Sequence, residues 1–244
     1  MRTFMREDFV RGKARPYNIS RRDLVLKSFS SLLESCNLVS NRIVITIVDN
    51  NSTEEFFERL NHIAKDKNVK INIIKGKWGN SGMSMKESYN VAMNCKEDLI
   101  YFCEDDYLHL KNEVPEVLEV YEKKLIGRED IGVSPHDNGA LYQKIYPSYI
   151  FKGEKRHWRS CPVTTSTFFI KRQTFLKYNR FVLRGALQLK DKRRENIPEW
   201  TNVGNIWKRV PCLSPIPSLS CHFQAEEEFP PFIDWKKVLE EIKI

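Results

Sequence analysis

Short apolar runs and amphipathic stretches follow one another along the first half of the chain. Residues 42–48 (RIVITIV) and 98–103 (DLIYFC) are rich in β-branched and aromatic side chains, which predicts two buried strands. Residues 69–74 form a third such run, and residues 2–5 are expected to form a short first strand. The stretches between them have helical spacing. Helices are therefore expected at residues 20–36, 53–64, 84–95 and 114–125.

This order of segments predicts an α/β fold. Strand–helix–strand units produce a mainly parallel sheet with right-handed crossovers. The second half is less regular, and its basic segment 182–196 is expected to be a mobile loop. Its remaining elements are expected to be strands at 131–134, 168–170 and 210–213 and helices at 198–207 and 234–242. We expect one domain, residues 1–244, in which 1–110 and 111–244 form two halves.

Composition supports a folded, water-soluble domain. The chain has 244 residues, of which 41% are hydrophobic and 11% aromatic, enough for a substantial core. No apolar stretch approaches the ~20 residues that cross a bilayer. The first residues lack the apolar segment of a signal peptide. We expect a cytoplasmic protein, with peripheral attachment to a membrane surface left open.

The formal charge of +8 favours acidic partners such as nucleotides, phospholipid surfaces or nucleic acid. The sequence shows no helix-turn-helix, zinc-finger or RNP signature, so a nucleic-acid partner is not favoured. The six cysteines are scattered without a CxxC pair, which predicts buried free thiols rather than a zinc site or disulfides.

The densest chemical feature is the run of three acids that directly follows the apolar segment 98–103. Glu104, Asp105 and Asp106 repel one another unless a cation or solvent relieves the repulsion. Their hard oxygen ligands suit Mg²⁺ or Mn²⁺, which commonly also bind substrate phosphates. An acidic turn or a helix start neutralised by its dipole is the ordinary alternative.

A second strand also ends in an acid. Asp49 follows residues 42–48 and precedes Asn50-Asn51-Ser52. Ligands of open α/β sheets bind beyond the carboxyl ends of the strands, so both acidic sites are expected at one edge of the sheet. Asp49 could accept hydrogen bonds from a nucleoside, although capping the next helix is an alternative role.

In these features the sequence resembles the GT-A glycosyltransferases, especially their family-2-like branch. The resemblance rests on the succession of three motifs and runs to about His222, so it covers most of the chain. The motifs are Asp49-Asn50-Asn51-Ser52-Thr53, Gly79-Asn80-Ser81-Gly82, and Glu104-Asp105-Asp106 as a DxD-type motif that begins with Glu.

The resemblance implies a Rossmann-like GT-A fold with a mostly parallel central sheet flanked by helices and a smaller mixed part on the acceptor side. Residues 1–110 would bind a nucleotide-diphosphate sugar, and residues 111–244 a glycan or other hydroxyl acceptor. Donor contacts are implied for five residues: Arg6, Asp49, Asn80, Glu104 and Asp105. Asp106 and the late His222 would bind the divalent metal, Mn²⁺ or Mg²⁺, although a histidine held by one hydrogen bond is the simpler interpretation of His222.

Transfer with inversion requires a base for the acceptor hydroxyl. Glu199 follows Pro198 at an expected helix start and fits the acid that the family uses; Asp191 and Asp137 are weaker candidates. A dipole-stabilised helix acid is an equally good account of Glu199. Two other functions remain open on sequence alone: a nucleotidyltransferase of related fold, and a basic module that binds nucleic acid or an anionic surface.

Overall fold

The first half of the chain builds a small parallel sheet. The computed structural model describes residues 1–3, 15–78, 81–143, 145–188 and 199–244, with the side chains of 81, 185, 187–188 and 199–202 left out. The strands are β1 (Arg2–Thr3), β2 (Val44–Asn50) and β3 (Lys70–Gly76), in the order β1-β2-β3. Both pairings are parallel, with Thr3 opposite Asp49 and Asp49 opposite Lys75.

Helices with local start signals connect these strands. α1 (Arg21–Cys36) begins at Ser20, whose hydroxyl accepts a hydrogen bond from the Asp23 amide at 3.0 Å. α2 (Glu54–Ala64) begins in the same way at Thr53. Such caps satisfy amides that have no partner inside the helix. α3 (Ser81–Asn94) then leads to the second sheet.

The second sheet has six strands in the order β4-β9-β6-β10-β8-β7. Only β6 and β10 are parallel neighbours; the other pairings are antiparallel. The α/β class is therefore confirmed, but the mostly parallel sheet is limited to the first three strands. The strands are β4 (Leu99–Phe102), β6 (Gly132–Val133), β7 (Ile150–Lys152), β8 (His157–Ser160), β9 (Phe168–Lys171) and β10 (Cys212–Ile216).

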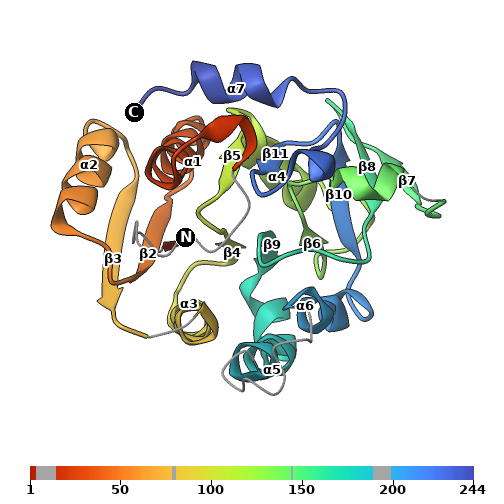
Figure 1. The fold of residues 1–244 in the computed structure, drawn as a ribbon. Helices are drawn as coiled ribbons and strands as arrows, with labels where there is room; N and C mark the ends of the chain where they lie inside the picture. Colours follow the sequence, from red (N-terminus) through yellow and green to blue (C-terminus); the bar gives the residue numbers. More distant parts are fainter. Residues whose placement is uncertain (4–14, 79–80, 144, 189–198) are drawn as a thin grey trace.

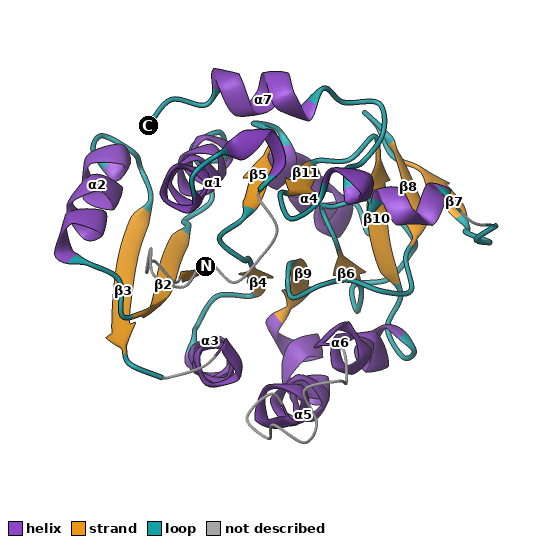
Figure 2. Ribbon diagram, in the orientation of Figure 1, coloured by secondary structure: helices purple, strands orange, loops and turns teal. Residues whose placement is uncertain are grey.

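Helices cover the sheets on both faces (Figure 1). α1, α2 and α4 (Glu113–Glu122) pack on one face, around a core that includes Phe29, Phe56 and Val117. α3, α5 (Arg172–Gln188) and α6 (Glu199–Trp207) pack on the other, around Tyr89 and Phe175 (Figure 2). Within the described residues, no helix combines the length and apolar composition that crossing a membrane requires.

A third, smaller sheet lies beside the strand ends. β5 (Tyr107–His109) pairs antiparallel with β11 (Ser220–His222), and α7 (Trp235–Glu241) packs over them through Trp235. The sequence analysis did not predict β5, β7 or β8 as strands. The expected loop at 182–196 is wrong for residues 182–188, which continue α5; residues 189–196 lie outside the described part.

Candidate functional site

The acids at the carboxyl ends of β2 and β4 lie close together, and β1 joins them. Thr3 donates from its hydroxyl to Asp49 Oδ1 at 2.8 Å. Its neighbour Arg2 donates its backbone amide to the Cys103 carbonyl at 3.0 Å and its guanidinium to Glu104 Oε1 at 2.7 Å. A two-residue strand therefore links the two acidic sites. The two sites were expected to lie together because both follow the carboxyl ends of strands.

Asp49 organises the turn between β2 and α2. Its side chain is 1% exposed, and its oxygens accept from the Thr3 hydroxyl, from the Ser52 hydroxyl and from the Ser52 amide at 2.9 Å. Asn51 has a φ of 68°, a conformation that Asn tolerates better than most residues. The helix cap itself is Thr53, so Asp49 shapes the turn rather than capping α2.

Arginines compensate all three acids of the DxD-type motif. Arg2 pairs with Glu104, and Arg21 pairs with Asp105 at 2.6 Å. Arg15 and Arg21 approach Asp106 Oδ2 at 3.2 and 3.5 Å. Buried carboxylates need such partners, because an unpaired buried charge is costly.

His222 completes the environment of Asp106. β11 holds His222 directly opposite Tyr107, and its Nε2 lies 3.3 Å from Asp106 Oδ1. Burial by itself would raise the pKa of Asp106, but His222, Arg21 and Arg15 lower it far below its usual value. Burial disfavours the charged imidazole, yet Asp106 raises the pKa of His222 above its ordinary value. Each group thus favours the charged form of the other, as in an ion pair.

Two aromatic groups frame this ion pair. The Tyr107 ring stacks on His222 with centroids 4.7 Å apart, and His136 contacts the Tyr107 ring edge-on at 5.7 Å. Burial and the nearby His222 lower the pKa of His136 to about 3, so this imidazole is neutral. Its Nδ1 faces the Ser220 carbonyl at 3.3 Å, and its buried Nε2 has no hydrogen-bond partner among the described residues.

The side chains at this site provide the ligands of a divalent ion only in part. Asp106 and His222 are a carboxylate and an imidazole at one point, a combination that suits Mn²⁺. No group of three His, Cys, Asp or Glu side chains arranged around a metal occurs among the described residues. Two protein ligands suffice for an ion that keeps waters and binds substrate phosphates. Arg15 donates to Asp106 Oδ2, so it occupies an oxygen that such an ion would need.

A buried polar cluster surrounds Asp137, the residue after His136 and one of the weaker base candidates from the sequence. Asp137 is 1% exposed; Arg159 Nε lies 3.2 Å away, the Ser214 hydroxyl donates to it at 3.1 Å, and Tyr142 donates from its hydroxyl. Burial raises the pKa of this carboxyl. The Arg159 Nη2 is buried without a hydrogen-bond partner among the described residues.

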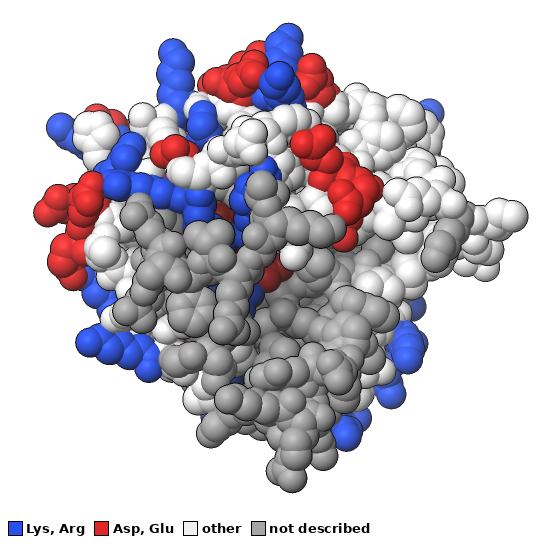
Figure 3. Space-filling view, in the orientation of Figure 1, with Lys and Arg blue, Asp and Glu red and all other residues white. Residues whose placement is uncertain are grey.

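Several predicted residues lie outside the described part of the chain. Arg6, Asn80 and Asp191 are not described at all, and Glu199 opens α6 with a side chain that is not described. The arginines at positions 2, 15 and 21 were missed as site residues, because nothing in their local sequence indicates which acid each one meets. On the face in Figure 3, the described basic and acidic side chains form separate small groups rather than one continuous basic field.

No protein-family model matches the sequence, and no curated protein is significantly similar to it.

Proposed function

We propose that the chain is a metal-dependent glycosyltransferase that uses a nucleotide-diphosphate sugar. The observation that carries this proposal is the junction at β1, where Arg2 and Thr3 bind the acids that end β4 and β2. Asp106, two residues beyond Glu104, forms a carboxylate–imidazole pair with His222. The succession of motifs that resembles GT-A enzymes supports the same assignment.

In this proposal the basic groups receive the diphosphate. Arg15 and Arg21 hold Asp106 in this structure, and we expect them to turn toward the donor phosphates when these arrive. Arginine suits this role because its planar guanidinium binds phosphate through two hydrogen bonds. Asp49 would hold the nucleoside side of the donor, and Arg6 and Asn80 stay predicted donor contacts.

Asp106 and His222 would hold the divalent ion, whose chemistry is to neutralise the charge that develops on the departing diphosphate. His222 must give up its proton to act as a ligand, since only neutral imidazole binds metal. The Asp106–His222 ion pair therefore predicts that metal binding releases a proton.

The acceptor hydroxyl needs a base, and Glu199 is our first candidate. Asp137 is a second candidate, because burial raises the pKa of its carboxyl and so makes it a better proton acceptor. Glu199→Gln and Asp137→Asn distinguish them: the variant that lacks the base should lose turnover while still binding the donor.

The direct test is Asp106→Asn, with Asp130→Asn as control, since Asp130 is an exposed acid paired with Arg128. A thermal-shift screen of UDP-, GDP-, dTDP- and CMP-sugars with and without Mn²⁺ identifies the donor, because a ligand of the native state raises apparent stability. Asp106→Asn should then lose the Mn²⁺-dependent shift and at least about 100-fold of nucleoside-diphosphate release, while its circular dichroism stays unchanged.

Three outcomes would contradict the proposal. Full transfer activity of Asp106→Asn, or of the protein in excess chelator, would show that the reaction does not depend on a metal. Release of pyrophosphate instead of nucleoside diphosphate assigns a nucleotidyltransferase. Steeply salt-dependent nucleic-acid binding without any sugar-nucleotide shift assigns a binding module.

A further inference from the structure

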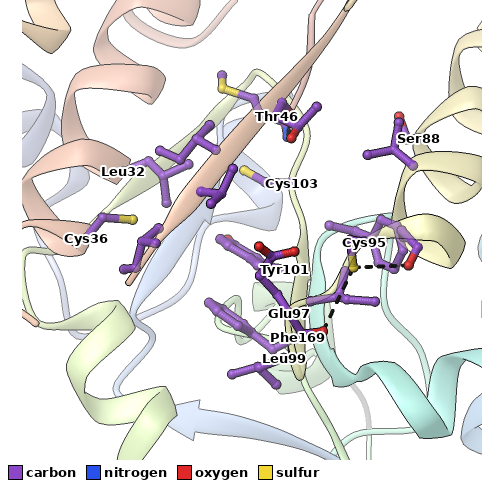
Figure 4. Close-up of a pocket in the computed structure, with 18 of the residues that line it drawn as sticks. Leu32, Cys36, Thr46, Ser88, Cys95, Glu97, Leu99, Tyr101, Cys103 and Phe169 are labelled. Atoms are coloured by element: carbon purple, nitrogen blue, oxygen red, sulfur yellow. Dashed lines mark hydrogen bonds between the residues drawn. The ribbon is translucent and has the colours of Figure 1, made fainter. Parts of the chain in front are cut away.

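A cavity of about 570 Å³ separates the parallel sheet from the six-stranded sheet. Its walls include consecutive residues of two strands, 44–46 of β2 and 99–102 of β4. A cavity that follows successive residues runs along the backbone edge of a strand, because side chains alternate between the two faces. Figure 4 shows Thr46 on one side of the space and Tyr101 and Cys103 on the other.

Both walls are strand edges along most of their length. In the described pairings, residues 44–47 of β2 pair only with β3, and residues 99–102 of β4 pair only with β9. β1 reaches only the carboxyl end of this space, where it pairs with Val48 and Asp49. Exposed strand edges carry amide and carbonyl groups that can bind a further strand.

The width of the space at that end is the width of one strand. The Val48 amide donates to the Met1 carbonyl at 2.9 Å, and the Arg2 amide donates to the Cys103 carbonyl at 3.0 Å. Residues 1–3 thus contact both walls at once. Helices close the two faces with apolar side chains, Leu32 and Val114 on one face and Met85 and Tyr89 on the other.

We propose that this slot binds an extended apolar peptide segment, which enters between β2 and β4 as a strand parallel to β2 and in line with β1. Three to four residues fill it, since Arg2 opposite Val48 leaves residues 44–46 of β2 open beyond Met1 and a strand rises about 3.3 Å per residue. β-branched residues suit it because both faces are covered. A bound segment would join the two sheets into one. This proposal does not depend on the proposed function.

The chemistry favours a peptide over an acyl chain. An acyl chain would fill the volume but leave the edge amides and carbonyls of both strands without partners, which is unfavourable in a buried place. The Met1 ammonium also lies here and donates to the Thr46 carbonyl at 2.9 Å; burial lowers its pKa. If a peptide segment were joined to the Met1 nitrogen, that nitrogen would become an amide. The amide could keep the hydrogen bond to Thr46, and the buried charge would be absent.

The test fuses a Val-Ile-Val-Ile-Val segment directly before Met1 of the full chain. The control is Val-Pro-Val-Pro-Val, which is similarly apolar but has two prolines that cannot donate to a strand. The first fusion should raise the melting temperature by roughly 5 °C or more over the control. Hydrogen exchange of the Thr46 and Tyr101 amides should slow at least about tenfold, since β-pairing protects them.

A second arm adds the acetylated, amidated Val-Ile-Val-Ile-Val peptide or decanoate to the unfused chain. Slower exchange at Thr46 and Tyr101 with the peptide, but not with decanoate, supports the proposal even if the fusion does not fold. Equal effects of both fusions, or protection by decanoate as strong as by the peptide, would overturn it.

Discussion

The carboxylates of the candidate site have two kinds of partner, arginines that reach over from the N-terminal part of the chain and a histidine from β11. Among them, Arg21 contacts both Asp105 and Asp106. The pKa of Arg21 is raised, chiefly by Asp105. Its charge is thus shared between two acids, and a phosphate that replaces one of them keeps the guanidinium paired.

Arg21 and Arg22 provide a matched pair of substitutions. Arg21→Gln should weaken sugar-nucleotide binding about tenfold or more, since charged partners of a bound anion contribute a few kcal/mol. Arg22 pairs with Glu55, whose side chain is 67% exposed, and such pairs contribute little. Arg22→Gln should therefore leave affinity unchanged. Isothermal titration with the donor found by thermal shift measures both; equal losses would show that Arg21 has no special role.

At the scale of elements, α6 is held against the sheet by close packing at β6. The Trp207 ring covers Gly132, and its Nε1 donates to the Thr164 hydroxyl at 2.8 Å. A Cβ on Gly132 would lie 2.3 Å from the ring. Glycine at this position is what allows the aromatic side chain to approach the strand.

Two glycine substitutions should have opposite effects. Gly132→Ala should lower the free energy of unfolding by about 1–3 kcal/mol, because the added methyl overpacks against Trp207. Gly204→Ala lies inside α6, where its Cβ would meet, among the described residues, only the Pro162 carbonyl at 3.9 Å. It should raise stability by up to about 1 kcal/mol through helix propensity. Urea unfolding of both variants checks this. A lower free energy of unfolding for Gly204→Ala would mean that α6 leaves no room for a methyl group at this position.

At the scale of the whole molecule, a buried polar network connects α4, β5 and the end of β4. His109 and Glu113 are fully buried and lie 2.8 Å apart, and Cys103 Sγ lies 3.6 Å from His109 Nε2. Burial opposes the charged imidazole, but Glu113 outweighs it and raises the pKa of His109 to about 10. Removing one partner of such a pair typically costs about 3–5 kcal/mol.

This network makes stability depend on pH. The folded pKa of His109, about 10, exceeds the unfolded value of about 6.5. Its contribution is therefore complete below about pH 6.5 and is lost as the pH rises toward 10. Urea midpoints should fall over this window. The double variant His109→Gln/Glu113→Gln should show a flatter profile; identical slopes would show that the pair is not charged.

The strands and helices of the first half, apart from β5, could be predicted from sequence because their signals are local. Each signal involves residues that are close in sequence. Examples are the apolar runs, the cap at Ser20, and the acids that follow residues 42–48 and 98–103. The second half was harder, since strands such as β7 and β8 are too short to show a period.

The sequence by itself determined the α/β class and the position of Asp49 and Glu104–Asp106 at strand ends. The tertiary structure alone decided which groups meet them: Arg21 lies 84 residues from Asp105, and His222 reaches Asp106 through the β5–β11 pairing. It also decided that β1 leaves a slot between the sheets. Such contacts depend on how distant elements pack, and no local preference of a residue specifies its distant partner.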